Sequence, residues 1–474
     1  MRHSKRNRNM KTLIMAIHTG RDARDLLRTD VLKVLRANDL RIVILSPAAD
    51  EDYFREEFAG DNVTVEKLHP APGGLELIFT RLMHKLFCSA RFSETMDIKY
   101  ERRRRLTSSW ILIALSFWLS KNVSRLVPCR NTTRKMLRRL NVILFPDRYY
   151  GELFKKYEPE LVLTTHTFGS DDTPVLKRAI QNKVPTISMA SSWDVLTTKG
   201  QIPVQIDKLI VWNEIVKEEA VKLHGFSAND VYIVGGPQFD LYFRREELLA
   251  RDEFFRKIGA DTNRKLLTYT TSTPSSMPFE PEIIEIISHY IEENRFCYPC
   301  QLLMRLNPRD DFNRYENIKG LENVILERAG QRSQSFRDRW NPNEDDMLHL
   351  ANLMLHSDVV INVASTITID ASCFDTPVVN IAFDGYQKQS YWNSVARYYD
   401  YTHYKNIVKS GGVRIGRSAE ELLKHINAYL ENPKLDSKGR KRIMREQCYK
   451  SDGRAGERVA NCILDFMNSN AKTR

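Results

Sequence analysis

The sequence predicts an α/β protein made of two doubly wound domains in tandem. The chain has 474 residues, more than a single hydrophobic core usually supports. Short apolar runs of strand length alternate with stretches of helical periodicity along most of the chain. These runs are continuously apolar and do not alternate with polar residues, which indicates strands covered on both faces, as in a parallel sheet.

The first series of strands and helices predicts an N-terminal domain over residues 1–245. Residues 12–17 form an apolar run, residues 27–35 have helical periodicity, and residues 41–45 form the next run. This order predicts a strand–helix–strand unit. Further strands are expected at residues 63–68, 161–165, 186–189, 208–212 and 231–234.

The second series begins after a charged helical stretch at residues 246–257 and predicts a second domain over residues 246–445. Its strands are expected at residues 265–270, 301–306, 323–326, 359–362 and 377–381. Helices are expected between them, for example at residues 281–293 and 345–356.

A basic segment interrupts the first series and is interpreted as an insertion at about residues 75–150. Residues 81–142 contain 15 Lys and Arg against 3 Asp and Glu, and this surplus of 12 equals the net charge of the whole chain, +12. Four consecutive arginines precede an apolar run that begins at Trp110 and ends at Leu119. The arginines are Arg102, Arg103, Arg104 and Arg105.

Two interpretations of this segment stay open. The run is much shorter than the roughly 20 residues that span a bilayer, so one interpretation is a helix that lies on an anionic membrane with its tryptophans among the headgroups. The other is a buried core helix beside a solvated basic loop. Nucleic-acid binding is not expected, because the aromatic residues form one block and do not interleave with the charges.

Cysteine usage and the N-terminus favour a cytoplasmic protein. The seven cysteines are scattered and odd in number, which argues for a reducing compartment. The basic N-terminus precedes a short strand-like run and no small-residue cleavage site, so no signal peptide is expected. Cys297 and Cys300 have no second pair to complete a zinc site, and no glycine-rich dinucleotide motif or P-loop follows the first strand. We therefore expect neither a metal nor a cofactor.

The most informative stretch is residues 345–379. The turn formed by Ala364, Ser365 and Thr366 follows the predicted strand at residues 359–362 and starts the next helix. Backbone N–H groups, the helix dipole and two hydroxyls are expected to converge there on an anion such as a diphosphate. Asp370, about one turn further on, is placed to accept hydrogen bonds from ribose hydroxyls. The alternative is ordinary N-capping of this helix by Ser365 or Thr366.

This stretch resembles the donor-site signature of glycosyltransferases with the GT-B fold, in which the pattern aDvvi..St..iEa...g.Pvv recurs. Asp370 stands where those families usually have Glu, and Asp375 where Gly is common. The resemblance implies two Rossmann-like domains that face each other across a cleft, with the nucleotide donor on the second domain. It also implies that a C-terminal helix within residues 446–474 crosses back to the N-terminal domain.

Two more loops of the second domain are expected at the same edge of the sheet. Arg305, Asn307 and Arg309 close a strand and resemble the K/R-x-H-P segment of CDP-glycerol glycerophosphotransferases, with Asn307 in place of the His. The two arginines are candidates for neutralising a leaving phosphate, and the alternative is a strand-ending turn with solvated arginines. Thr270 and Thr271 follow the first strand of this domain, where GT-B proteins keep a small polar loop near the donor.

Loops of the first domain resemble successive motifs of bacterial surface-polysaccharide transferases, namely SWD.lt.kG, vWn and v.G.p.fD at residues 191–200, 211–213 and 234–240. Direct displacement needs a base near the acceptor hydroxyl, and GT-B enzymes supply it from this domain. The candidates are His166, Asp194 and Asp171, in that order, with Asp22 and His18 on the first loop behind them. His166 is preferred because its unperturbed pKa lies near neutrality, although such residues also commonly form caps and turns.

Together, these patterns favour a metal-independent glycosyltransferase at the inner face of the cell membrane. It would move a sugar from a nucleotide-diphosphate donor to a cell-surface glycan or a lipid-linked acceptor. Three alternatives stay open: transfer of a polyol phosphate from a CDP-polyol, epimerisation of a UDP-sugar by a 2-epimerase-like enzyme, and a non-catalytic scaffold in glycan assembly.

Overall fold

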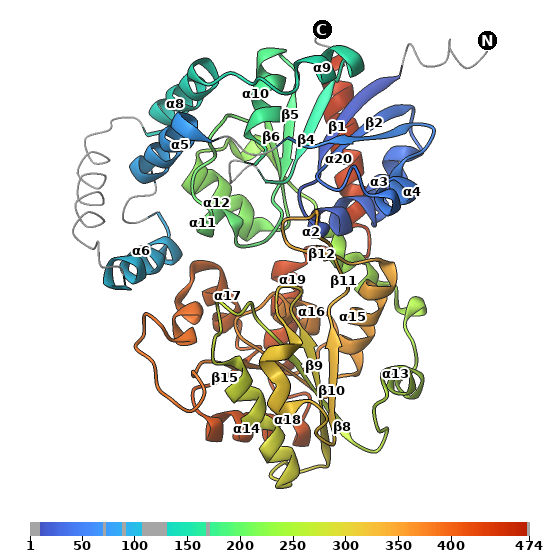
Figure 1. The fold of residues 1–474 in the computed structure, drawn as a ribbon, viewed down its shortest axis with the longest axis vertical. Coiled ribbons are helices and arrows are strands. Elements are labelled where there is room, and N and C mark those ends of the chain that lie inside the picture. Colours follow the sequence, from blue (N-terminus) through green and yellow to red (C-terminus); the bar gives the residue numbers. More distant parts are fainter. Residues whose placement is uncertain (1–9, 70–72, 88–91, 107–129, 167–170, 472–474) are drawn as a thin grey trace. The chain divides into compact units, whose positions relative to one another are not determined.

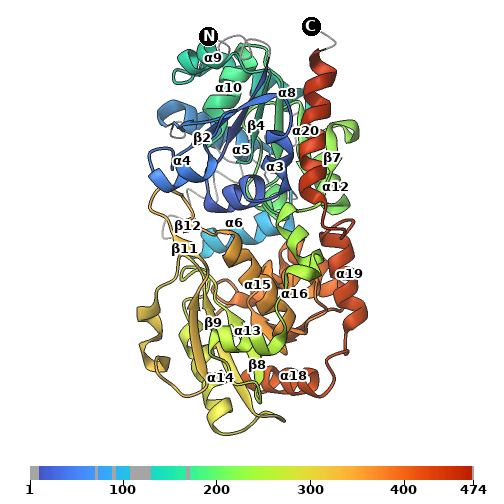
Figure 2. The same ribbon diagram turned by 90° about the vertical axis from the view of Figure 1, so that its right-hand side faces the viewer.

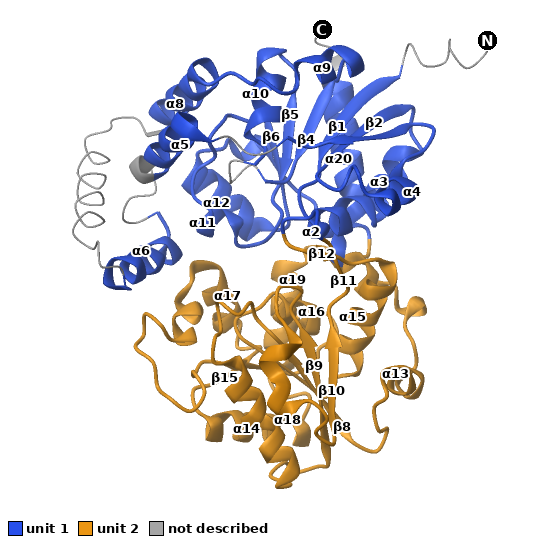
Figure 3. Cartoon of the chain, in the orientation of Figure 1, with its two compact units in different colours: residues 1–238, 334–337, 454–474 blue, residues 239–333, 338–453 orange. Residues whose placement is uncertain are grey.

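The computed structural model describes residues 10–69, 73–87, 92–106, 130–166 and 171–471. The chain divides into two compact units (Figure 3). The first contains residues 1–238, 334–337 and 454–474, and the second contains residues 239–333 and 338–453. Each unit has a parallel β-sheet with helices packed on it, which confirms the predicted fold class of two doubly wound α/β domains (Figure 1).

The sheet of the first unit has seven parallel strands in the order β3-β2-β1-β4-β5-β6-β7. Its strands are β1 (Lys11–Ala16), β2 (Leu40–Ser46), β3 (Val63–Lys67), β4 (Leu161–Thr164), β5 (Thr186–Met189), β6 (Lys208–Val211) and β7 (Val231–Ile233). The helical segments before β4 are α2 (Gly20–Asp22), η1 (Ala23–Leu27), α3 (Asp30–Arg36), α4 (Asp52–Phe58), α5 (Gly74–Phe87), α6 (Glu94–Leu106), α8 (Arg130–Leu144) and α9 (Gly151–Tyr157). Those after β4 are α10 (Thr173–Gln181), α11 (Val195–Thr198), α12 (Glu214–His224), η2 (Ala228–Asp230) and the C-terminal α20 (Ala455–Ala471).

The sheet of the second unit has six parallel strands in the order β10-β9-β8-β13-β14-β15. Its strands are β8 (Lys265–Thr270), β9 (Cys300–Leu306), β10 (Val324–Arg328), β13 (Val359–Asn362), β14 (Val378–Ile381) and β15 (Arg414–Gly416), and β11 (Gln331–Arg332) pairs with β12 (Trp340–Asn341) separately. The helical segments up to β10 are η3 (Pro237–Phe243), η4 (Arg245–Glu247), α13 (Arg251–Ile258), α14 (Glu280–Glu292) and η5 (Phe312–Ile318). Those after β12 are α15 (Glu344–His356), α16 (Ile367–Ser372), η6 (Val395–Asp400), α17 (Thr402–Ser410), α18 (Ala419–Glu431) and α19 (Ser437–Gln447).

Burial on both faces explains the continuous apolar runs of the second unit. Successive side chains of a strand point to opposite faces, and both faces are buried here. Leu267 packs into a core with α14 and α18, whereas its neighbour Leu266 packs into a core with α13 and α15. Val359 and Val360 divide in the same way. A strand covered on both faces has consecutive apolar residues, as the sequence shows at 266–267 and 359–361.

The basic insertion is attached to the first unit through buried polar contacts. Lys177 on α10 is 1% exposed, and its ammonium donates hydrogen bonds to Glu76 of α5 at 2.6 Å and to the carbonyl of Phe145 at 2.6 Å. Arg138 of α8 is also buried and donates to the carbonyl of Ile202 at 3.2 Å. These contacts hold α5 and α8 to the rest of the first unit, because a buried cation left without partners would strongly destabilise the folded state.

The predicted membrane-facing residues are only partly described. The four arginines at residues 102–105 lie in the last turns of α6, where Arg104 pairs with Glu101 at 2.8 Å. The apolar run from Trp110 to Leu119 lies outside the described residues. Within the described ranges, none of the helices combines the length and the apolar character needed to cross a membrane.

The C-terminal helix α20 belongs to the first unit, where it packs against α3 (Figure 2). A Cβ atom added at Gly456 would lie 3.2 Å from the backbone nitrogen of Asp30, so the two segments approach closely at this glycine. Arg458 donates a hydrogen bond from Nε to the carbonyl of Val234 at 2.7 Å. The last helix therefore covers the end of β7 as well as α3.

Candidate functional site

The predicted site residues gather at one particular place in each sheet. The strand order reverses between β1 and β4 in the first unit and between β8 and β13 in the second. Ligands of open α/β sheets bind outside the carboxyl ends of the strands at such a reversal. His166 follows β4, Thr270 ends β8, and Ser365 follows β13. These three candidates therefore lie where a ligand is expected. Asp194 follows β5, and the segment from Arg305 to Arg309 ends β9, each one strand away from the reversal.

Two histidine–aspartate pairs lie side by side in the first unit. His166 Nε2 is 2.9 Å from Asp22 Oδ2, and His18 Nε2 forms a short contact with Asp172 Oδ1. The centroids of the two imidazole rings are 5.1 Å apart. Asp172 also accepts a hydrogen bond from the backbone N–H of His166 at 2.5 Å. Each pair joins the loop after β1 to the loop after β4, so the fold brings together residues about 150 positions apart.

The local sequence places Asp22 for this contact. Thr19 caps the short helix α2 by accepting a hydrogen bond from the backbone N–H of Asp22. Asp22 Oδ2 in turn accepts a hydrogen bond from the backbone N–H of Thr19 at 2.9 Å. The Thr19 hydroxyl donates to the same carboxylate oxygen at 2.7 Å. This capping box fixes the carboxylate in one orientation and leaves it facing the His166 ring.

Burial and pairing act in opposite directions on these pKa values. Burial alone would raise the pKa of Asp22, but the charge of His166 and hydrogen bonds from His166 and Thr19 hold it well below its usual range. Burial alone would lower the pKa of His166, but the carboxylate of Asp22 outweighs this effect and raises it. Both shifts favour an imidazolium–carboxylate pair. Proton exchange at His166 is therefore governed by Asp22.

The other two base candidates have different surroundings. Asp171 Oδ2 lies 3.9 Å from His166 Nδ1 and also pairs closely with Arg337, so Asp171 belongs to the same group. Asp194 begins α11 and accepts a hydrogen bond from the Thr198 hydroxyl at 3.1 Å. Asp194 also lies close enough to the buried carboxyl of Glu219 to influence it: burial first, and then the charge of Asp194, raises the pKa of Glu219 to about 8.

In the second unit, hydrogen bonds join the loops after β8 and β9. The Asn307 backbone N–H donates to the Thr271 hydroxyl at 2.8 Å, and the Arg309 backbone N–H donates to Asn307 Oδ1 at 3.0 Å. The buried hydroxyl of Thr270 has no hydrogen-bond partner among the described residues. A buried hydroxyl without a partner is costly, so Thr270 is a candidate for contact with a ligand or an ordered water.

Arg305 is committed to an internal ion pair. Its side chain is 6% exposed, and Nη1 lies 2.5 Å from Glu327 Oε1, while Glu327 Oε2 lies 2.7 Å from His349 Nε2. Burial alone would raise the pKa of Glu327, but Arg305 and His349 outweigh it and lower the pKa. The charge of Arg305 is thus already balanced within the sheet. It can polarise the strand end, but a phosphate would have to share this cation with Glu327.

The turn after β13 has an unusual backbone and a free hydroxyl. Ala364 has a φ of 40°, in the left-handed region that non-glycine residues seldom adopt. The Ser365 hydroxyl accepts the backbone N–H of Ile367 at 3.3 Å, a weak capping contact. Thr366 is exposed and makes no side-chain capping bond to α16. Capping therefore accounts for Ser365 but leaves the Thr366 hydroxyl available for a ligand.

Asp370 lies in α16, where its carboxylate is largely buried. It is 7% exposed, and Oδ1 accepts a hydrogen bond from the Tyr242 hydroxyl at 2.6 Å. Contact with a ribose would have to share the carboxylate with this tyrosine. Sequence reasoning missed Tyr242, because no motif links residues 128 positions apart.

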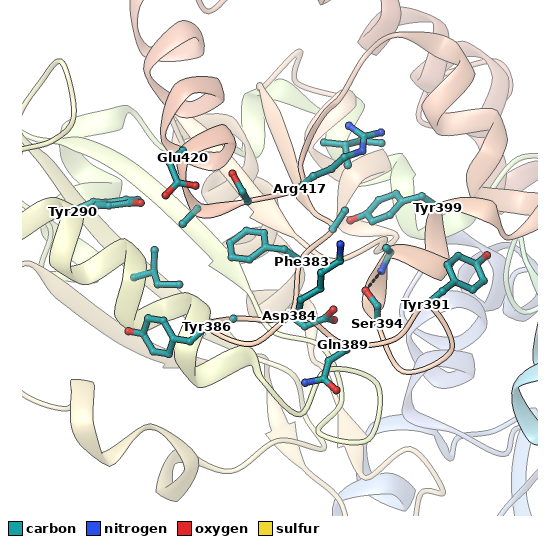
Figure 4. A pocket seen from close by; sticks show the side chains of 18 of the residues that line it. Tyr290, Phe383, Asp384, Tyr386, Gln389, Tyr391, Ser394, Tyr399, Arg417 and Glu420 are labelled. Carbon is teal, nitrogen blue, oxygen red and sulfur yellow. Dashed lines mark hydrogen bonds between the residues drawn. The ribbon is translucent and has the colours of Figure 1, made fainter. Parts of the chain in front are cut away.

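A wide pocket opens on the second unit near the carboxyl ends of β14 and β15 (Figure 4). Its volume is about 1000 Å³. One wall is formed by Tyr399, whose hydroxyl donates to the carbonyl of Ile381 at 2.6 Å. The other labelled aromatic side chains are Tyr290, Phe383, Tyr386 and Tyr391, and the polar ones include Asp384, Gln389, Arg417 and Glu420. The sequence offered no signal for this pocket, since its residues are dispersed between positions 286 and 420.

Comparison with protein families gives one match, to CDP-glycerol:poly(glycerophosphate) glycerophosphotransferase, over residues 304–465. The match covers about one third of the chain and includes the loops that contain Arg305 and Ser365. No curated protein sequence matches this chain.

Several solved structures share the fold. The Staphylococcus aureus MnaA–UDP structure superposes with a TM-score of 0.52 at 13% identity, over 97% of both chains. The UDP-GlcNAc 2-epimerase from Neisseria meningitidis bound to UDP-GlcNAc gives 0.52 at 11% identity, over 96% of this chain and 100% of that one. A glycosyltransferase from Rickettsia africae gives 0.50 at 11% identity, over 96% and 99%. The chain is therefore a protein of the GT-B fold, with a glycerophosphotransferase-like segment in its C-terminal half.

Proposed function

We propose that the protein is a glycosyltransferase that moves a sugar from a nucleotide-diphosphate donor to a cell-surface glycan or a lipid-linked acceptor. The observation that supports this most is the His166–Asp22 pair at the strand reversal of the first unit, because a part-buried imidazole faces a buried carboxylate in a defined orientation. Perturbed pKa values caused by burial and a specific charge partner are typical of catalytic groups.

The proposed base is His166 acting through Nδ1. Asp22 accepts from Nε2, so the neutral ring keeps its proton there and presents the Nδ1 lone pair. Nδ1 takes the proton of the acceptor hydroxyl while the acceptor oxygen bonds to the anomeric carbon. The bond from that carbon to the phosphate oxygen breaks, and its electron pair leaves with the diphosphate. Asp22 stabilises the imidazolium that forms, as the aspartate of a catalytic triad does.

The proposed donor site is the strand reversal of the second unit. Thr366 and Thr270 offer hydroxyls without hydrogen-bond partners among the described residues, and Arg309 offers an exposed guanidinium. Hydroxyls, backbone N–H groups and a cation suit the two phosphates of a leaving nucleotide, and stabilising that leaving group is expected to dominate catalysis. Thr271, Ser365, Asn307, Arg305 and Asp370 would complete the site, the last two through shared contacts. The mechanism proposed here uses no metal and no cofactor.

Two observations favour a different reaction at the same site. The family match to CDP-glycerol:poly(glycerophosphate) glycerophosphotransferase favours transfer of a polyol phosphate, with attack on phosphorus. The likeness to UDP-GlcNAc 2-epimerases favours epimerisation, although at 11% identity it bears on the fold alone. The pocket of about 1000 Å³ with aromatic walls is larger than a glycerol group needs, and it supports a glycosyl group.

The location of the protein in the cell is also part of the proposal. A cytoplasmic protein held at the inner face of the cell membrane would meet a lipid-linked acceptor there. The basic last turns of α6, with Arg102 to Arg105, are suited to anionic lipid headgroups, since each such residue near the surface is worth about 1 kcal/mol.

The donor site is tested by measuring thermal unfolding of the protein in the presence of nucleotides. UDP, GDP, CMP and CDP are compared, since a ligand at 100 times its dissociation constant stabilises by about 2.7 kcal/mol. We expect one nucleotide to raise Tm, and Thr366→Val to reduce this shift. Thr262→Val serves as control, because Thr262 is exposed in the loop that precedes β8, at the opposite edge of the sheet. The absence of a shift with all four would contradict the transferase and favour the scaffold.

Product analysis separates the enzymatic alternatives. Release of the nucleoside diphosphate only when an acceptor is present supports glycosyl transfer. Release of CMP from a CDP-polyol supports phosphotransfer, and turnover of a UDP-sugar without acceptor supports epimerisation. A scaffold would instead tolerate His166→Ala and Asp194→Ala without loss of glycan synthesis.

A further inference from the structure

Two arginines meet at a single backbone carbonyl in the second unit, outside the proposed donor site. Arg328 ends β10 and donates from Nη1 to the carbonyl oxygen of Asp310 at 3.1 Å. Arg332 of β11 donates from Nη2 to the same oxygen at 2.8 Å. Two guanidinium groups are thus held close together by a neutral acceptor. The proximity of Arg332 adds to burial in lowering the pKa of Arg328.

The carboxylates around this pair do not neutralise it. The Asp310 side chain is fully buried and already engaged, by Arg314 at 2.8 Å and by the Tyr315 hydroxyl at 2.6 Å. Asp311 is 3.7 Å from Arg332, with both side chains about half exposed, so this contact is a weak surface pair. The exposed Arg309 adds another cation from the same loop. The charged side chains in contact with Asp310 and Asp311 are therefore three cations, Arg314, Arg328 and Arg332, against these two carboxylates.

Other arginines of the same unit show what is unusual here. Arg305 pairs with Glu327 at 2.5 Å, Arg440 with Asp375 at 2.9 Å, and Arg251 with Asp358 at 2.7 Å. Arg328 instead packs its guanidinium over the ring of Phe312, 4.7 Å from the centroid. A guanidinium held by an aromatic ring and a carbonyl has further N–H groups, in the fork that matches phosphate oxygens.

The position of this pair separates it from Ser365 and Thr366, the part of the proposed donor site that follows β13. The sheet order β10-β9-β8-β13 places β10 three strands away from β13. Neighbouring strands lie about 4.8 Å apart, so the ends of β10 and β13 are roughly 14 Å apart. A diphosphate bound at Ser365 and Thr366 cannot also reach Arg328. The arginines are available for another anionic group.

We propose that Arg328 and Arg332 form a second anion site that binds a phosphate group distinct from the donor diphosphate at Ser365 and Thr366. The site goes beyond the proposed transfer reaction, because phosphate binding there does not require that reaction to take place. Bidentate guanidinium–phosphate hydrogen bonds would hold the group. The consequence is that the chain recognises a phosphate-bearing second ligand, such as a phosphorylated acceptor.

Calorimetric titration tests this site on the full chain, with inorganic phosphate, glycerol 3-phosphate and UDP as separate probes. We expect Arg328→Gln/Arg332→Gln to weaken phosphate and glycerol 3-phosphate binding at least tenfold while UDP binding stays within twofold. Ser365→Ala/Thr366→Val should do the reverse. Arg256→Gln, an exposed arginine on α13, is the matched control. Tighter binding of glycerol 3-phosphate than of inorganic phosphate would identify an acceptor-type ester as the ligand, whereas equal affinity would identify free phosphate.

Three results would overturn the inference. The first is phosphate binding that is absent at millimolar concentration in the folded wild type. The second is binding that the double variant leaves unchanged. The third is joint loss of UDP and phosphate binding in that variant, which would place the arginines in the donor site. Arg328→Lys, which keeps the charge and loses the fork, covers the case in which the double variant fails to fold, and it should weaken phosphate binding severalfold. An absent UDP signal with intact phosphate binding would count against the proposed function and leave this site standing.

Discussion

The two strand reversals use their charged residues in opposite ways. In the first unit, His166 and His18 face the carboxylates of Asp22 and Asp172, so titratable groups pair with one another at the strand ends. In the second unit, the cation Arg305 is balanced by Glu327, and the hydroxyls of Thr270 and Thr366 have no hydrogen-bond partner in the part of the chain that the structure describes. Proton transfer needs paired titratable groups, whereas phosphate binding needs donors left unpaired. We infer a division of tasks between acid–base chemistry and anion binding.

The largest effect is expected from the histidine–aspartate pair. His166→Ala should lower kcat by about 10² to 10⁴, the usual contribution of a general base. Asp22→Asn should lower kcat and also move the acidic limb of the pH–rate profile to lower pH, because the carboxylate that raises the pKa of His166 is gone. The rate is expected to fall as pH drops through the pKa of His166, since only the neutral ring accepts a proton. Asp194→Asn, with a different hydrogen-bond partner, serves as the comparison.

An unchanged pH profile in Asp22→Asn would remove the basis for this assignment. NMR titration of the His166 ring measures the same pKa without any substrate. A ring pKa that does not fall in Asp22→Asn would show that the pair is not coupled as described.

The second prediction concerns the ion pair between Arg305 and Glu327. Glu327→Gln leaves a buried arginine without its counter-charge, which typically costs about 3 to 5 kcal/mol. Urea unfolding without ligand should show this loss, because the pair acts on the fold. Arg442→Gln removes an exposed pair with Glu446 and should change stability by less than about 1 kcal/mol. A variant that loses nucleotide binding but no stability would show that Arg305 serves the ligand directly.

The third prediction concerns Glu280, near the start of α14. Its carboxyl is buried and accepts the Ser272 backbone N–H at 2.9 Å, and burial raises its pKa to about 8. A folded-state pKa above the unfolded value favours folding at low pH and ceases to do so as pH rises through about 8. Wild-type stability should therefore decline from about pH 4.5, the ordinary pKa of a glutamate, to about pH 8, and level off above it, with a total loss of a few kcal/mol at most. Glu280→Gln should flatten this decline, and parallel curves for the two proteins would refute the assignment.

The smallest effect is expected at the free hydroxyl of the donor loop. Thr366→Val removes one hydrogen-bond donor from the proposed diphosphate site, worth about 1 kcal/mol or fivefold in affinity. Nucleotide titration measures this loss, and unfolding stability should not change because the hydroxyl makes no capping bond. Equal affinities for Thr366→Val and Thr262→Val would remove Thr366 from the site.

Much of the fold could be predicted from local sequence patterns, and the strands that were missed have one cause in common. Strands buried on both faces, such as β8 and β13, were predicted within a few residues because they contain consecutive apolar residues, as at 266–267 and 359–361. The short strands β11, β12 and β15 were not predicted, because each has only two or three residues and none forms an apolar run. In the site, the polar loops after β4, β8, β9 and β13 were all identified. Their internal partners, Tyr242, Glu327 and Asp172, were not.

The sequence alone determined the α/β class, the tandem arrangement and the loops that contain His166, Arg305 and Ser365, because periodicity and motifs are local properties. Only the tertiary structure decided which of these groups are committed to internal partners. Asp22 faces His166 across 144 positions, and Glu327 neutralises Arg305 from the next strand. Such pairings depend on strand order, which sets neighbours in space independently of their distance in sequence. The charge available to a ligand is what remains after those pairings are made.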